Sequence, residues 1–207
     1  MVWIKICGVT SIEDALAVAD AGADAIGLNF APSSPRRIEP ARAAEIVRAV
    51  GPRVQWVGVF VDAEAGFVED TASEVGLDLL QLHGAETPEA LRALGPRAFK
   101  AVRIGEPADV EKARAFAGDR LLVDSKVVGS WGGTGHRFDW SLLGSLPSER
   151  RVVLAGGLVP GNVEQAVREL RPFGVDTASG VESAPGKKDS ALVREFVLRA
   201  RAGSSEG

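Results

Sequence analysis

Eight short apolar runs, each followed by a segment with helical or loop character, recur along the chain and constrain its fold more than any other feature. Most of these runs lack the alternation of polar and apolar residues that a half-exposed strand shows. Strands of a parallel sheet have this composition because helices cover both faces of the sheet. The expected strands are Trp3–Cys7, Ala25–Phe30, Gln55–Val61, Leu79–Leu82, Ala98–Arg103, Leu121–Asp124, Val152–Ala155 and Val175–Ala178.

Helix-start signals lie between the expected strands. Thr10 and Glu13 have the spacing of a capping box and precede an apolar stripe at helical spacing. Thr87-Pro88 and Glu39-Pro40 place a proline where the first helical turn would begin. These signals predict helices that alternate with the strands.

The strand–helix unit recurs roughly eight times at intervals of about 20–30 residues, which predicts a single-domain (β/α)8 TIM barrel. The domain is expected to span residues 1–202, with residues 203–207 as a frayed tail. A doubly wound open sheet is the competing fold. No G-x-G-x-x-G sequence follows the first strand, which favours the barrel without removing the alternative.

Charge and cysteine content narrow the classes of function. The net charge of −4 argues against sequence-independent nucleic-acid binding, which needs a basic stripe. The single cysteine allows no internal disulfide and fits a reducing compartment. No signal-peptide pattern opens the sequence, and no apolar stretch reaches the roughly 18 residues of a membrane span. We expect a cytoplasmic protein with no membrane partner, and the sequence leaves the choice between a monomer and a homodimer open.

Two reactive side chains stand at the ends of expected strands. Cys7 ends the first strand and Asp124 ends the sixth, so in a barrel both would face the same mouth. A thiol and a carboxyl group across one pocket form a candidate acid–base pair. The alternatives are a small buried hydrophobic residue for Cys7 and a helix cap or loop anchor for Asp124.

Glycine-rich turns follow the last two expected strands. Gly156 and Gly157 come after the seventh strand, with Asn162 in the start of the next helix, and Ser179 and Gly180 come after the eighth. Such turns let backbone N–H groups approach an anion, and barrels frequently bind phosphate at this position. Each glycine alone would also suit a simple tight turn, but the two loops together predict a phosphate site.

Other candidate site residues lie in the connecting loops. Arg36 follows the second strand and has the planar fork that binds a carboxylate or phosphate, although a solvated loop charge is the equal alternative. His83 follows the fourth strand and fits a hydrogen-bonded structural role better than a catalytic one. The long loop Ser125–Arg137 contains Trp131, which would cover an apolar ring or pack the loop. No His, Cys, Asp and Glu cluster has metal-ligand spacing, so no metal is expected.

The sequence resembles the phosphoribosylanthranilate isomerase family along nearly its whole length, in several motifs that occur in collinear order. The motifs are Lys5-Ile6-Cys7-Gly8 with Thr10, Gln81-Leu82-His83-Gly84, Asp124-Ser125-Lys126, Gly132-Gly133-Thr134-Gly135 with Phe138-Asp139-Trp140, Ala155-Gly156-Gly157-Leu158 with Pro160 and Asn162, and Val175-Asp176 with Ser179-Gly180-Val181-Glu182 and Pro185-Gly186-Lys187-Lys188-Asp189.

The resemblance implies an isomerase of tryptophan biosynthesis that carries out an Amadori rearrangement. N-(5-phosphoribosyl)anthranilate would become 1-(2-carboxyphenylamino)-1-deoxyribulose 5-phosphate, with Cys7 as base, Asp124 as acid and Arg36 at the anthranilate end. The expected partner is therefore a small phosphorylated molecule with an aromatic carboxylate. The imine formed on ring opening accepts the electron pair itself, so no cofactor is expected. Arg37, His136-Arg137 and Val159 depart from the family pattern, which affects loop contacts rather than the reaction.

Rival functions lack their own signatures. Sugar-phosphate epimerases of this shape use acidic pairs, often with metal-binding histidines. Relatives that act on both histidine and tryptophan intermediates carry Asp where Cys7 stands, and the indole-forming synthase needs Lys and Glu motifs that are missing. A non-catalytic phosphate sensor would keep the glycine-rich loops but would not need both Cys7 and Asp124.

Overall fold

The computed structural model describes residues 1–125 and 150–204. Within these residues, parallel strands β1 to β8 close into a barrel, in which each strand pairs with the next and β8 pairs with β1. The (β/α)8 prediction is confirmed, and the open doubly wound sheet is excluded because β1 and β8 are hydrogen-bonded neighbours. The strands are β1 Trp3–Cys7, β2 Ala25–Asn29, β3 Gln55–Phe60, β4 Leu79–Leu82, β5 Ala98–Ile104, β6 Arg120–Ser125, β7 Arg151–Ala155 and β8 Gly174–Thr177.

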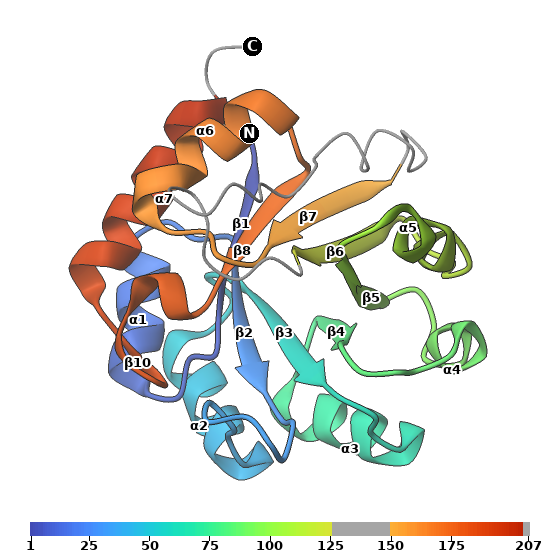
Figure 1. Cartoon of the computed structure of the whole chain (residues 1–207). Helices are drawn as coiled ribbons and strands as arrows, with labels where there is room; N and C mark the ends of the chain where they lie inside the picture. Colours follow the sequence, from blue (N-terminus) through green and yellow to red (C-terminus); the bar gives the residue numbers. More distant parts are fainter. Residues whose placement is uncertain (126–149, 205–207) are drawn as a thin grey trace.

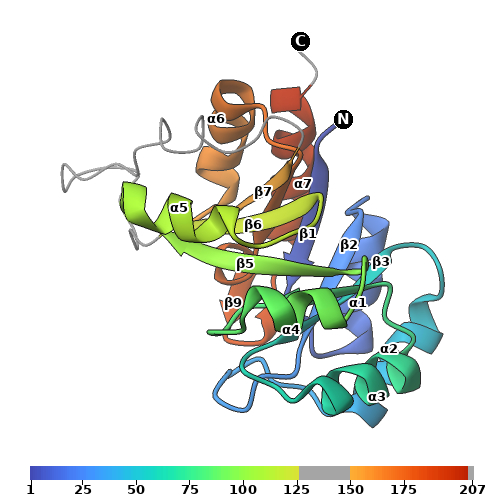
Figure 2. The same ribbon diagram turned by 90° about the vertical axis from the view of Figure 1, so that its right-hand side faces the viewer.

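Helices surround the strands on the outside of the barrel (Figure 1). Helices α6 and α7 lie side by side in both views (Figures 1 and 2). A short antiparallel hairpin of β9 and β10, which the sequence did not predict, follows β8 and a single turn of 3₁₀ helix. The described elements outside the barrel are α1 Ile12–Asp20, α2 Pro40–Val50, α3 Ala65–Val75, α4 Pro88–Ala93, α5 Pro107–Arg114, α6 Pro160–Leu170, η2 Ser179–Val181, β9 Glu182–Ala184, β10 Lys187–Lys188 and α7 Ser190–Ser204.

The starts of α4 and α1 test two of the predicted helix caps. Thr87 caps α4 as expected, since its hydroxyl accepts a hydrogen bond from Ala90 N at 3.2 Å. Helix α1 is capped by Ser11, which accepts from Asp14 N at 3.1 Å, and not by Thr10. The Thr10 hydroxyl instead donates to the Gly186 carbonyl at 2.7 Å and so ties the start of α1 to the β9–β10 turn.

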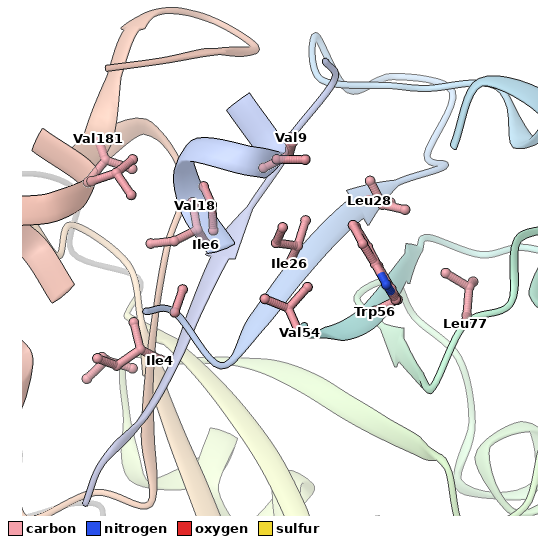
Figure 3. Close-up of a cluster of buried hydrophobic side chains, with 14 of the residues drawn as sticks. Ile4, Ile6, Val9, Val18, Ile26, Leu28, Val54, Trp56, Leu77 and Val181 are labelled. Carbon is pink, nitrogen blue, oxygen red and sulfur yellow. The ribbon is translucent and has the colours of Figure 1, made fainter. Parts of the chain in front are cut away.

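The strands divide the core into two layers. Ile4 and Ile6 of β1 point outward and pack, with Val18 of α1 and Ile26 of β2, in the layer between barrel and helices (Figure 3). Because side chains alternate along a strand, Lys5 and the neighbouring odd-numbered positions of β1 point into the barrel. Trp3 and apolar residues of the other strands fill the interior toward the amino-terminal ends of the strands. Polar side chains occupy the interior nearer the carboxyl ends.

The C-terminal boundary differs from the prediction. Helix α7 continues through Gly203 and Ser204, two residues beyond the expected end of the domain at residue 202. Gly203 is buried against α6, where a Cβ would come within 2.5 Å of the Glu164 carbonyl oxygen. Ser204 Oγ accepts a hydrogen bond from Val2 N at 3.1 Å, which joins the end of α7 to the start of β1. The rest of the predicted tail lies outside the described residues. Among the described helices, none combines the length and apolar character that crossing a bilayer requires.

Candidate active site

A cavity of about 390 Å³ lies at the carboxyl ends of the barrel strands. Cys7 is the last residue of β1, Asp124 lies near the end of β6, and His83 directly follows β4. The sequence-predicted residues that line this one cavity are Cys7, Arg36, His83, Asp124, Gly156, Gly157, Ser179 and Gly180. Of the predicted site residues that the structure describes, Asn162 alone does not line it. The structure thus brings together side chains and loops from both ends of the sequence.

Cys7 lies at the inner end of the cavity and is only 9% exposed. Burial raises the pKa of its thiol above the ordinary value, while the positive charges of Lys5 and Lys188 act in the opposite direction without cancelling the effect. The thiol is protonated at neutral pH, and its thiolate forms only as the pH rises through that raised pKa.

Asp124 projects into the same cavity with its side chain 24% exposed. Its Oδ2 lies 3.6 Å from His83 Nε2 and 3.8 Å from Arg103 Nε. Both separations exceed hydrogen-bonding distance, so the carboxyl group has positively polarised neighbours and no fixed donor among them. It is therefore placed to exchange a proton with a ligand.

His83 is anchored on one side and open on the other. Its backbone N–H donates to Phe60 O at 2.8 Å, and its Nδ1 lies 3.2 Å from Gln81 Nε2. Among the described residues, His83 Nε2 and Gln81 Oε1 are buried without a hydrogen-bond partner. Buried polar atoms are normally paired, so these two are suited to receive polar groups of a bound molecule.

Arg36 lies at the cavity wall with its guanidinium bound to Glu182 in a bidentate ion pair. The Nε–Oε1 distance is 2.8 Å and the Nη2–Oε2 distance is 2.6 Å. Lys188 reaches the same carboxylate at 2.8 Å and donates to the Cys7 carbonyl at 2.7 Å. Burial acts to raise the pKa of Glu182, but the hydrogen bonds from Arg36 and Lys188 hold it below its ordinary value. Arg36 is therefore a fixed cation and not the freely solvated loop charge that the sequence had left as an alternative.

The two glycine-rich loops meet beside the carboxyl ends of β7 and β8. A Cβ on Gly180 would come within 2.0 Å of the Leu158 carbonyl oxygen, so only glycine lets the loop after β8 approach the loop after β7. The Thr177 hydroxyl donates to the same carbonyl at 2.7 Å. Asn162 braces the first loop from behind, since its Oδ1 accepts from Val159 N at 2.8 Å and its Nδ2 donates to Gly157 O at 3.0 Å. The loop after β7 leads directly into the N-terminus of α6, where helix N–H groups favour an anion.

Some predicted features fall outside the described residues. These are Trp131, His136 and all of the loop Ser125–Arg137 beyond Ser125. Within residues 1–125 and 150–204, no cluster of three or more His, Cys, Asp or Glu side chains is arranged to hold a metal ion.

Three charged residues of the site were not singled out from the sequence, although they lie in the family motifs: Lys188, Glu182 and Asp176. A signal for Asp176 was present, because a lone charge stands inside the otherwise apolar strand β8, as Lys5 does inside β1. An isolated charge in a buried parallel strand is rarely tolerated without a partner. Glu182 and Lys188 lie in a hairpin whose path only the folded chain defines.

Comparisons with known proteins identify the family. Residues 4–199 match the family model described as N-(5'phosphoribosyl)anthranilate (PRA) isomerase. The N-(5'-phosphoribosyl)anthranilate isomerase of Magnetococcus marinus is 49% identical over 200 residues, which cover 97% of this chain and 95% of that protein.

Solved structures extend the likeness to three dimensions. A phosphoribosyl anthranilate isomerase in complex with reduced 1-(o-carboxyphenylamino)-1-deoxyribulose 5-phosphate superposes with a TM-score of 0.86 at 42% identity, covering 97% of this chain and 99% of that one. Monomers generated from the dimeric isomerase of Thermotoga maritima superpose with a TM-score of 0.85 at 41% identity, covering the same shares of the two chains. By sequence and fold, the chain belongs to the N-(5'-phosphoribosyl)anthranilate isomerase family.

Proposed function

We propose that this chain isomerises N-(5-phosphoribosyl)anthranilate to 1-(2-carboxyphenylamino)-1-deoxyribulose 5-phosphate, a step of tryptophan biosynthesis, with Cys7 as base and Asp124 as acid. One observation supports these roles above the others. The only cysteine of the chain and the Asp124 carboxyl group, which has no hydrogen-bond donor within reach on His83 or Arg103, line the same cavity as two glycine-rich loops. A single phosphorylated sugar in this cavity would meet all of these groups.

The two ends of the substrate match two walls of the cavity. The phosphate is assigned to the loops of Gly156, Gly157, Ser179 and Gly180, next to the N-terminus of α6. The anthranilate carboxylate is assigned to Arg36, whose Nη1 makes no contact with Glu182. The ribose between them would offer hydroxyl groups to His83 Nε2 and Gln81 Oε1, for which residues 1–125 and 150–204 supply no hydrogen-bond partner.

The chemistry follows from these positions. The Asp124 carboxyl group donates a proton to the ribose ring oxygen, so the bond from C1′ to that oxygen breaks and an iminium ion forms. The Cys7 thiolate then removes the proton from C2′, and the electron pair moves through C1′ to the nitrogen to give an enolamine. Protonation of C1′ and loss of the hydroxyl proton at C2′ complete the ketone. A base of raised pKa is scarce at neutral pH but correspondingly strong, which partly offsets its low population.

Direct assay tests this proposal. The purified chain, with no metal or cofactor added, is expected to consume the fluorescence of freshly prepared phosphoribosylanthranilate. A protein that only senses a phosphorylated ligand would bind the product but leave that fluorescence to decay at the spontaneous rate, and such a result would contradict the proposal.

Substitution of Gly180 tests the proposed phosphate site. Gly180→Ala forces a methyl group into the Leu158 carbonyl and separates the two loops, so KM is expected to rise by about tenfold or more, equivalent to the loss of roughly 1.4 kcal/mol of binding. Steady-state kinetics and competition by inorganic phosphate measure the effect. Gly161→Ala is the matched control, because Gly161 is exposed in the first turn of α6 and a Cβ there meets nothing within 4 Å. An unchanged KM in Gly180→Ala would place the phosphate elsewhere.

Location and assembly complete the proposal. We assign the reaction to the cytoplasm, because a cysteine that acts as a base must stay reduced. A homodimer is the assembly to test, and light scattering of the purified chain distinguishes it from a monomer.

A further inference from the structure

Lys5 is a fully buried lysine directly beneath the proposed base. It lies two residues before Cys7 on β1, so both side chains point into the barrel. Its Nζ is 2.8 Å from Asp176 Oδ1, and the lysine side chain has no exposed surface. Lys5 and Asp176 are register partners across the β1–β8 pairing, which explains how residues 171 positions apart form this bond.

The neighbouring strand makes room for the lysine and the thiol together. Gly27 of β2 is the register partner of Cys7. A Cβ on Gly27 would come within 2.8 Å of Cys7 Sγ and 3.0 Å of Lys5 Cε. The sulfur and the end of the lysine stem therefore share the space that a larger residue would fill.

The charges around Cys7 do not balance while it remains a thiol. The cations that act on it are Lys5, Lys188 and Arg36, and the carboxylates bound to them are Asp176 and Glu182. On β2, the positions that face it are the uncharged Gly27 and Asn29, and across the cavity lie Asp124 and His83. One positive charge remains in the immediate cluster, and a thiolate at Cys7 would neutralise it.

We propose that Lys5 is a positioning residue for the base, and that its ammonium group, held in place by Asp176, stabilises the thiolate of Cys7. The inference rests on the proposed function for its consequence in catalysis, but not for the electrostatic effect itself. Burial acts to lower the pKa of Lys5, but the Asp176 carboxylate and the nearby Cys7 hold it above its ordinary value, which favours the charged ammonium group. Burial lowers the pKa of Lys188 instead, which makes Lys5 the more dependable cation.

The simpler alternative is that Lys5 and Asp176 form an ion pair that only stabilises the barrel interior. Both interpretations predict that loss of Lys5 destabilises the fold. They differ in the titration of Cys7, which an ion pair of purely structural role would leave unchanged.

The composition of the chain makes this titration unusually direct. Cys7 is the only cysteine, and the sequence contains no tyrosine whose phenolate would absorb in the same region. The ultraviolet absorbance of the thiolate can therefore be followed against pH in the unliganded protein, with Cys7→Ser as the blank. Lys5→Met is expected to move the midpoint to higher pH by roughly one to three units, the range for loss of a close opposite charge.

A second substitution is expected to shift the midpoint of the Cys7 titration in the opposite direction. Asp176→Asn removes a negative charge that raises the pKa of Cys7, so its midpoint is expected to move to lower pH. General destabilisation cannot shift the midpoint in two directions, and this variant carries the test alone if Lys5→Met does not fold. The matched control is Lys100→Met, which removes another buried lysine, paired with Glu86 at 2.7 Å, and is expected to leave the midpoint unchanged.

An unchanged midpoint in a folded Lys5→Met variant, or an upward shift in Asp176→Asn, would overturn the inference. The titration uses no substrate, so its failure differs from failure of the proposed function, which would appear as absent isomerase activity.

Discussion

Cys7→Ser is expected to lower kcat by at least about a hundredfold, the scale of a general acid–base contribution. The hydroxyl group occupies nearly the same space as the thiol but ionises far less readily. The proton at C2′ would then lose its proposed base, because a serine hydroxyl group is a poor proton acceptor at neutral pH. Stopped-flow or steady-state measurement of substrate fluorescence gives the rate.

Product binding is the control for this variant. Since Cys7 is assigned to proton transfer and not to the phosphate or carboxylate contacts, Cys7→Ser should bind the product with nearly unchanged Kd. Turnover within a few fold of the unsubstituted chain would assign the base to another residue.

Asp124→Asn is expected to produce a loss of similar size, at least about a hundredfold in kcat. The amide group keeps the shape of the carboxyl group and still donates a hydrogen bond, but it cannot transfer a proton to the ribose ring oxygen. Ring opening should therefore become the slow step. Single-turnover experiments would show the fluorescent substrate persisting on the enzyme.

The exposed Asp20→Asn variant serves as the matched control for Asp124→Asn. Asp20 forms its described ion pair with Arg53, and both side chains are largely exposed, so its loss should leave kcat unchanged. Full activity in Asp124→Asn would show that the ring opens without this carboxyl group.

The pH dependence of the rate would not by itself identify the base. A pair in which the thiolate and the protonated carboxyl group are both minor forms gives the same bell-shaped profile as a pair with the opposite assignment. Burial raises the pKa of Cys7, so its thiolate is the minor form at neutral pH. Direct titration of the thiol and the two substitutions above are therefore needed together.

Much of the fold followed from local sequence. The strand starting at Trp3 and ending at Cys7 was predicted with its observed bounds. A mainly apolar run of this length that ends at a glycine is typical of a buried strand. The cap of α1 was displaced by one residue, because Thr10 has a tertiary partner, the Gly186 carbonyl, that no local pattern reveals. The tail was predicted to begin at residue 203, but α7 continues through Ser204, because Gly203 packs closely against α6.

The candidate site, like the fold, was predictable from the sequence only in part. The sequence by itself determined which reactive groups stand at strand ends, because strand order and the direction of a parallel barrel send Cys7, His83 and Asp124 to one mouth. Only the tertiary structure decided the electrostatics. The pairing of Lys5 with Asp176, the pairing of Arg36 with Glu182 and the raised pKa of Cys7 depend on burial and on contacts between residues distant in the sequence. Charge interactions depend on distance and solvent exposure, and neither quantity is defined until the barrel closes.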